Sequence, residues 1–351
     1  MALNEATTPN NNAAFGTQAM RRLTTGSENT AIGTEALRQS TTGSNNTAVG
    51  SASLILNTTG SNNVAHGYHA LFNNTTASNN TAVGYQAGYT GTTAANITLL
   101  GYRAGYTNTA SGVTAVGNDA LYSNTTGSGI VAVGKGALLS NTTGSDNVSV
   151  GQNSLDANTT GGNNTAVGHD ALTTNTTASN NTAVGYKTLY SSTTGVHNIA
   201  VGATAMQNTT TGLNNTAVGG AALISNTTGG TNTAIGRQAL YLNTTASNNT
   251  AVGYQAGYSN TTGSDITAVG YQALDSNTTG NYNTAIGLSA LQSNTTASSN
   301  TAVGRRAMFG NSTGGDNIGI GYHAMYSNTT GSSNVSIGKD ALLGATFTDN
   351  V

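Results

Sequence analysis

Residues 46–62 read NTAVGSASLILNTTGSN, and residues 249–265 read NTAVGYQAGYSNTTGSD, so one pattern recurs far along the chain. Its glycine occurs 20 times, from Gly16 to Gly338, and 18 of the 19 intervals are 17 residues long. The interval from Gly101 to Gly117 is 16 residues. A short fixed period indicates that each copy is one stackable unit, so we expect a single repetitive domain over residues 1–351. We number the unit so that this glycine is position 5.

Composition excludes several classes of function. Only 6% of the residues are charged and the net charge is −2, which argues against an electrostatic grip on nucleic acid. No apolar run approaches the ~18 residues of a membrane-spanning helix, so no membrane insertion is expected. The chain has no cysteine for disulfides, and its one proline leaves room for continuous hydrogen-bonded ladders. No signal peptide is visible at the start.

The columns of the repeat predict the fold. Position 4 is Val or Ile in most copies and position 2 is Thr, Val or Ile, so we expect both side chains on the buried face of a short strand. Ala at position 8 and Leu or Met at position 9 complete the expected core. Glycine at position 5 and Gly or Ala at position 15 mark two bends. The prediction is an all-β, parallel β-solenoid of about 20 coils, with two strands per coil and partial coils at 1–11 and 339–351.

Two further columns bear on the interior. Asn is near-constant at position 1 and common at position 12, and stacked Asn side chains can hydrogen-bond along a column. Position 9 is Gly88, Gly105 or Gly257 in three copies, and each is followed by a tyrosine. We expect that tyrosine to fill the space that the leucine leaves.

Position 3 lies between the expected core positions and therefore points outward in this reading. It is Ala in 16 copies, whereas a solvent-facing column would tolerate Lys, Glu or Gln. Uniform alanine predicts close approach by another chain, and thus a homotrimer; the alternative is packing under a loop of the same coil. The expected interchain residues are Ala31, Ala48, Ala82, Ala166 and Ala302.

The unit Asn-Thr-Ala-Val-Gly, in register over essentially the whole chain, resembles the head repeats of trimeric autotransporter adhesins. It is also similar to repeats in the shafts of some phage tail fibres. The resemblance implies a parallel β-roll, a homotrimer and an extracellular, cell-surface or virion location. The period is longer than in the adhesin heads because of the added Asn-Thr-Thr-Gly segment.

Three features of the repeat suggest possible binding surfaces. Tyrosines at position 6 could form an exposed ladder for sugars or a host surface, or could simply cover the bend and pack on one another. Adjacent threonines at positions 13 and 14 suggest the possibility of ice binding, although adjacent residues cannot both face outward on a straight strand. The Asn-x-Thr sites at position 12 are candidate glycan acceptors or plain turn residues. The ladder residues are Tyr68, Tyr85, Tyr102, Tyr254 and Tyr271.

No catalytic, cofactor-binding or metal-binding set is expected, because the five histidines fall in different coils and repeat positions. His66 alone interrupts the apolar column at position 4. The chain is therefore predicted to be a structural, non-enzymatic fibre or adhesin-like protein. Its expected partners are copies of itself, with possible head-to-tail stacking into filaments, and a cell-surface glycan or receptor. The alternative is a module that binds ice or polysaccharide through Thr or Tyr ladders.

Overall fold

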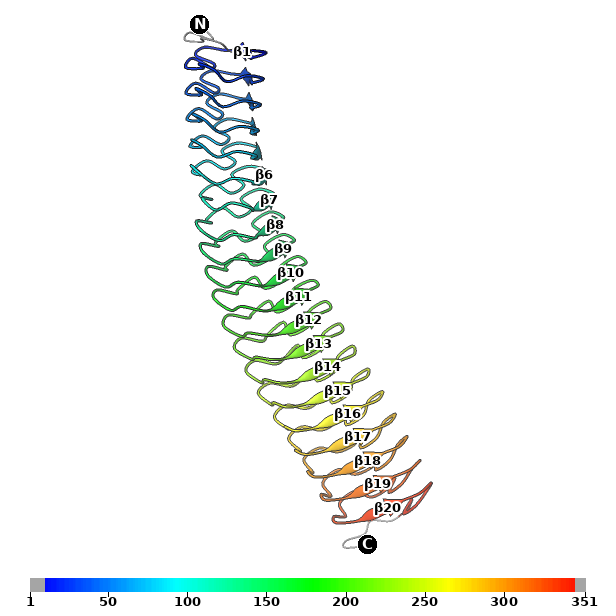
Figure 1. Cartoon of the computed structure of the whole chain (residues 1–351). Coiled ribbons are helices and arrows are strands. Elements are labelled where there is room, and N and C mark those ends of the chain that lie inside the picture. The colour runs from blue at the N-terminus through cyan, green and yellow to red at the C-terminus, as the bar shows by residue number, and fades with distance from the viewer. Residues whose placement is uncertain (1–9, 345–351) are drawn as a thin grey trace. The chain divides into compact units, whose positions relative to one another are not determined.

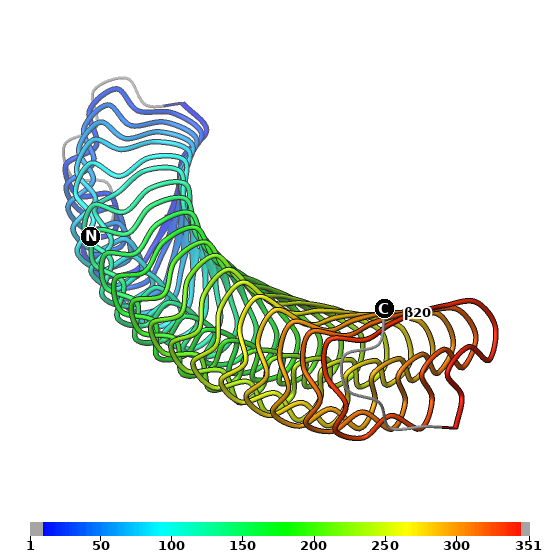
Figure 2. The same cartoon turned by 90° about the horizontal axis from the view of Figure 1, so that it is seen from below.

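The computed structural model describes residues 10–344, and in that range the chain is an all-β, parallel β-solenoid of about 19 turns with no helix. Its contacts divide it into two compact units, Met1–Ala178 and Ser179–Val351. The partial coils expected at 1–11 and 339–351 lie mostly outside the described residues. Seen end-on, successive coils of the first unit trace similar flattened outlines (Figure 2).

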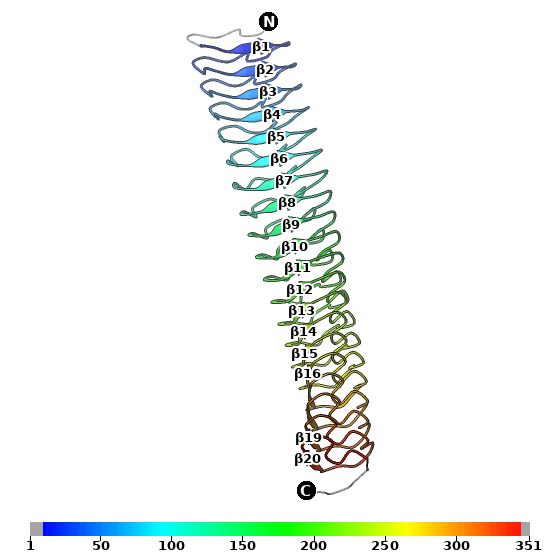
Figure 3. The same cartoon turned by 90° about the vertical axis from the view of Figure 1, so that its right-hand side faces the viewer.

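The first unit carries one row of ten three-residue strands, which follow one another in sequence order (Figure 3). Neighbours pair in parallel with a shift of one repeat, so Thr30 lies beside Thr47 and Ala31 beside Ala48. The strands are β1 (Ala13–Phe15), β2 (Thr30–Ile32), β3 (Thr47–Val49), β4 (Val64–His66), β5 (Thr81–Val83), β6 (Thr98–Leu100), β7 (Thr114–Val116), β8 (Val131–Val133), β9 (Val148–Val150) and β10 (Thr165–Val167).

The second unit repeats this arrangement with ten more strands (Figure 1). Thr250 lies beside Thr267, and Val252 beside Val269. The strands are β11 (Thr182–Val184), β12 (Ile199–Val201), β13 (Thr216–Val218), β14 (Thr233–Ile235), β15 (Thr250–Val252), β16 (Thr267–Val269), β17 (Thr284–Ile286), β18 (Thr301–Val303), β19 (Ile318–Ile320) and β20 (Val335–Ile337).

Each described coil has one strand, not the two expected. The other side of the coil is built from turns in which positions 7 and 9 are left-handed, as at Ala52 (φ 54) and Leu54 (φ 49). Such φ values are unusual for residues other than glycine and prevent a regular strand. Hydrogen bonds between coils still form there, because Leu54 N donates to Ala70 O at 3.0 Å.

The inside and outside of the strand are the reverse of the prediction. Alanine at position 3 points into the coil, and positions 2 and 4 point out. A Cβ added to Gly319, at position 3 of β19, would lie 2.6 Å from Met308 Cγ and 3.4 Å from Ala324 O, so this position faces positions 9 and 8. The coil is thin, and a small side chain at position 3 leaves room for the Leu or Met at position 9.

Two columns of buried asparagines complete the interior, as expected from their stacking. At position 1, the backbone N–H of Asn46 donates to Asn29 Oδ1 at 2.9 Å, and its Nδ2 donates to Gly60 O at 2.9 Å. At position 12, Asn74 Nδ2 donates to Asn57 Oδ1 at 2.9 Å and to Ala77 O at 3.1 Å. Each amide thus links successive coils and ties down a bend, which satisfies polar groups that would be costly to bury unpaired.

The space left by the position-9 glycines is filled from inside the coil, so the expectation that tyrosine fills it is wrong. A Cβ on Gly105 would lie 2.7 Å from Leu99 Cδ2, and one on Gly88 would lie 2.9 Å from Leu99 Cδ1. Leu99 stands at position 3, where most copies have Ala. Tyr89, which follows Gly88, is half-buried at the surface. Leu99 thus occupies part of the space that leucines at positions 88 and 105 would otherwise fill.

Candidate functional site

The outward face of the strands is formed by positions 2 and 4, and we call it the strand face. Its aliphatic side chains are well exposed, with 46% of Ile199 and 41% of Ile235 accessible. The interchain role predicted for the alanine column is wrong, because these side chains have no accessible surface to offer another chain. Each is 0% exposed and lies inside its own coil: Ala31, Ala48, Ala82, Ala166 and Ala302.

The strand face carries almost no charge. None of the strands β1–β20 has a Lys, Arg, Asp or Glu at position 2 or 4, and His66 is the one ionisable side chain there. His66 is exposed and lies between Val49 and Val83 of the neighbouring strands. The most exposed aliphatic and aromatic residues of the face are Phe15, Ile32, Val64, Val83, Val131, Ile199, Val201, Val218, Ile235, Ile286, Ile318, Ile320, Val335 and Ile337.

This face is also pre-ordered. Its residues are β-branched in nearly every copy, which restricts χ1, and parallel pairing holds interior strands such as β16 on both sides. Successive rungs stand about 4.8 Å apart, so each unit presents a lattice of threonine hydroxyls beside a lattice of aliphatic groups. Such a surface loses little conformational entropy when something docks on it.

The tyrosines of position 6 form ladders, as the sequence indicates. The ring centroids of Tyr68 and Tyr85 are 5.4 Å apart, those of Tyr85 and Tyr102 are 5.3 Å apart, and those of Tyr254 and Tyr271 are 5.4 Å apart. Interplanar angles of 9–14° show that the ring faces lie on one another. Only ring edges and hydroxyls face solvent along a ladder, so stacking of a sugar on these faces is hindered.

A second aromatic column at position 10 was missed by the sequence reasoning. Phe72, Tyr89, Tyr106 and Tyr122 stack in succession at 5.1, 5.1 and 5.0 Å, and Tyr241 stacks on Tyr258 at 4.9 Å. The signal was present as aromatic residues recurring at position 10 of consecutive copies. It was overlooked because Tyr89, Tyr106 and Tyr258 were assigned to the core, as replacements for the missing leucines.

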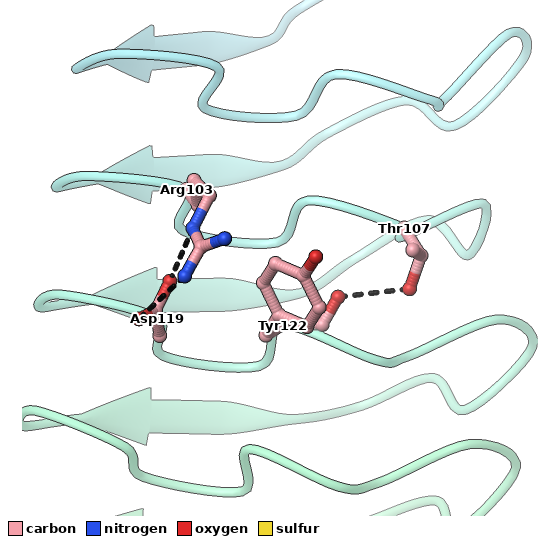
Figure 4. Close-up of polar contacts among 4 residues, drawn as sticks. All are labelled: Arg103, Thr107, Asp119 and Tyr122. Carbon is pink, nitrogen blue, oxygen red and sulfur yellow. Dashed lines mark hydrogen bonds and ion pairs between the residues drawn. The ribbon is translucent and has the colours of Figure 1, made fainter.

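Arg103 and Asp119, both at position 7, form an ion pair close to Tyr122 of the position-10 column (Figure 4). Arg103 Nε donates to Asp119 Oδ1 at 2.8 Å and Nη2 donates to Oδ2 at 3.1 Å, and the guanidinium lies 4.8 Å from the ring centroids of Tyr102 and Tyr122. The hydrogen bond with Asp119 raises the pKa of Arg103 above its ordinary value. Thr107 Oγ1 donates to the carbonyl of Tyr122 at 2.8 Å, so this coil is tied to the next at two points.

The Asn-x-Thr sites at position 12 are closed in the folded chain. Asn57, Asn141, Asn226 and Asn311 are all 0% exposed, and Asn57 Nδ2, the atom a glycan would need, donates to Gly60 O at 2.9 Å. The two threonines that follow are split in role. Thr58 donates its hydroxyl to Thr75 O at 3.0 Å, whereas Thr59 is exposed.

Among residues 10–344, no three His, Asp or Glu side chains form a group that could hold a metal ion. The same part of the chain has no helix long and apolar enough to cross a membrane.

No protein-family model matches this chain, and none of the curated proteins matches it.

Proposed function

We propose that this chain is a structural, non-enzymatic fibre protein that associates with copies of itself through the strand face, as a homotrimer. The observation that carries the proposal is the exposed, charge-free strand face, repeated rung after rung within each unit. Soluble monomers rarely expose large contiguous apolar patches, and such patches mark interaction sites. The alanine column, buried in its own coil, has no part in the contact.

The partner is another copy of the chain, because the spacing of its strands must match the spacing of the strand face. A rigid surface that repeats every ~4.8 Å can be matched over many rungs only by a partner with the same spacing. A second copy of the chain has that spacing by construction. Cyclic association of identical faces also lets every chain use the same residues.

The mass in solution tests the proposal. The purified chain should sediment as a trimer, and the paired change Ile235→Lys and Ile286→Lys should shift it toward the monomer by burying charge without a partner. The matched control is Thr245→Lys with Thr279→Lys, which adds the same charges at exposed residues of position 14 and should leave the trimer intact. A monomeric wild-type chain would contradict the proposal.

Cysteine cross-linking gives a second, independent readout, since the natural chain has no cysteine. Ile286→Cys should form a disulfide between copies on mild oxidation, because equivalent rungs meet in a cyclic assembly. The control is Thr279→Cys, which lies shortly before Ile286 in the sequence but at position 14, off the strand face. Its thiol should stay free. Equal cross-linking of both variants would place the contact elsewhere.

The biological role rests on the likeness of the Asn-Thr-Ala-Val-Gly units to adhesin heads and tail-fibre shafts. We accordingly place the trimer in an extracellular, cell-surface or virion appendage, as its shaft or head, with adhesion to a cell-surface glycan or receptor as its purpose. Head-to-tail stacking into filaments belongs to the same proposal. Electron microscopy tests the filament: particles no longer than one chain would rule it out.

A second candidate, ice binding, is favoured by one observation. Threonine at position 2 and Val or Ile at position 4 point to the same side of the strand and repeat in rigid register, as a match to ordered water requires. Adjacent threonines at positions 13 and 14 are not needed for it. Thermal hysteresis decides between the candidates, because a face buried in a trimer cannot meet ice; activity in a monomeric preparation would favour ice.

A further inference from the structure

Stacked tyrosines recur in both units, and none of the preceding proposals uses them. We call them the ladder tyrosines. At position 6 they include Tyr68, Tyr85 and Tyr102, and at position 10 Tyr89, Tyr106 and Tyr122. The second unit adds the pairs Tyr241–Tyr258 and Tyr254–Tyr271. All adjacent rings lie 4.9–5.4 Å apart with interplanar angles of 5–14°.

The arrangement brings reactive carbons of equivalent rings together. Each ring occupies the same repeat position as its neighbour and is nearly parallel to it, so it is close to a copy shifted by one coil. The carbon ortho to each phenol oxygen therefore lies beside the same carbon of the next ring. Tyr85 and Tyr102 are 43% and 45% exposed, so their edges can be reached by an oxidant.

We propose that the ladder tyrosines are sites of oxidative cross-linking between successive coils. Each phenol loses one electron and one proton, and the two phenoxyl radicals couple through their ortho carbons. Tautomerisation then moves the hydrogen on each coupled carbon to its own ring oxygen and restores the aromatic rings, which gives dityrosine. With hydrogen peroxide as oxidant and a haem peroxidase as catalyst, two tyrosines and one peroxide give one dityrosine and two waters.

Such links would change how the coils come apart. Coils are otherwise held by hydrogen bonds and packing with their neighbours, and the chain has no cysteine for disulfides. A bond between residues one repeat apart restricts the unfolded chain and prevents stepwise unravelling at that point. The geometry thus assigns the aromatic columns a role in hardening the solenoid.

The experiment exposes dilute purified chain to hydrogen peroxide and a haem peroxidase. Dityrosine fluorescence should rise while the denatured chain keeps the mass of a single chain, because the links form within it. Peptide mapping should show linked tyrosine pairs that have together lost two hydrogens. The expected pairs are Tyr68–Tyr85, Tyr85–Tyr102, Tyr89–Tyr106, Tyr106–Tyr122, Tyr241–Tyr258 and Tyr254–Tyr271. The cross-linked chain should unfold at higher denaturant concentration than the untreated one.

Tyr282 is the matched control. It is 65% exposed and has no stacked ring among the described residues. Tyr282→Phe should leave the pattern unchanged. Tyr85→Phe keeps a ring in the column but should abolish both links made by Tyr85. The Tyr106–Tyr122 link should still form in this variant, which would show that the chain remains folded.

Two results would overturn the proposal. One is cross-linking that follows exposure, with Tyr282 as the main site and the ladder pairs unlinked. The other is the same set of intrachain pairs, in the same yields, from chain treated in concentrated urea, because selectivity would then not come from the stacked geometry.

Discussion

Glycine at position 5 shows how a single hydrogen atom decides whether coils can stack. Gly219 has φ +133, and a Cβ there would lie 2.6 Å from both the carbonyl carbon and oxygen of Gly236. Gly219→Ala should therefore cost more than about 3 kcal/mol of unfolding free energy, from strain and from forced separation of the coils. Its neighbour Gly220 has nothing within 4 Å of an added Cβ. Gly220→Ala, measured by the same denaturant titration, should be near neutral; equal losses would show that crowding is not the cause.

Asp156 provides a residue-scale test of pH dependence. Desolvation, and then the charge of Asp170, raise the pKa of Asp156 above its ordinary 3.8. The folded chain then holds this proton more tightly than the unfolded chain. The contribution of Asp156 to stability is accordingly greatest at low pH and is lost as pH rises from about 3.8 through the folded-state pKa.

Asp156→Asn should remove that loss. We expect a higher denaturation midpoint than wild type at pH 7 and a smaller difference at pH 3.5, measured by urea titration at both pH values. Asp275→Asn is a parallel case, since desolvation alone raises the pKa of Asp275. A denaturation midpoint for Asp156→Asn below that of wild type at pH 7 would contradict the expected direction of the effect.

At the scale of the coil, the sequence specified the columns but not which of them face inward. Alternation along three residues groups positions 2 and 4 together and sets position 3 apart, and that much was predictable. Assigning Val and Thr to the core followed from hydrophobicity, whereas the inward position 3 of the thin coil holds Ala in 16 copies. The left-handed residues at positions 7 and 9 decide how close the two sides approach, and residues as ordinary as Ala52 and Leu54 give no sequence signal for that conformation.

Compensation between coils can be tested at Leu99. Leu99→Ala should leave a cavity and cost about 2–5 kcal/mol. Gly105→Leu alone should be destabilising too, because a Cβ there already lies 2.7 Å from Leu99 Cδ2. The double variant restores the common Ala at position 99 and Leu at position 105 and should recover part of the loss, while the space beside Gly88 stays unfilled; denaturant titrations of all four chains would show the recovery as a coupling energy. Simple additivity would mean that Leu99 and Gly105 do not share one space.

At the scale of the whole chain, the 17-residue period made the solenoid and its asparagine ladders predictable, because every copy must meet its neighbours through the same columns. Which side of the strand faces solvent was less predictable. The outward side was assigned to Ala48 and its equivalents, which lie inside the coil. It was assigned wrongly because one strand offers the same alternation for either orientation.

Stability that sums over neighbouring coils leads to a prediction about length. Deleting residues 220–236 in the second unit joins Gly219 to Arg237, which follow each other in the repeat, so every column stays in register. The chain should keep its fold and lose about 1–3 kcal/mol of unfolding free energy, as expected for 17 residues. Deleting residues 220–227 leaves a coil too short to complete a turn, which should break the ladder and admit protease at that point. Circular dichroism, urea titration and limited proteolysis compare the two; if the whole-repeat deletion is cut as readily as the shorter one, stability does not depend on nearest-neighbour stacking.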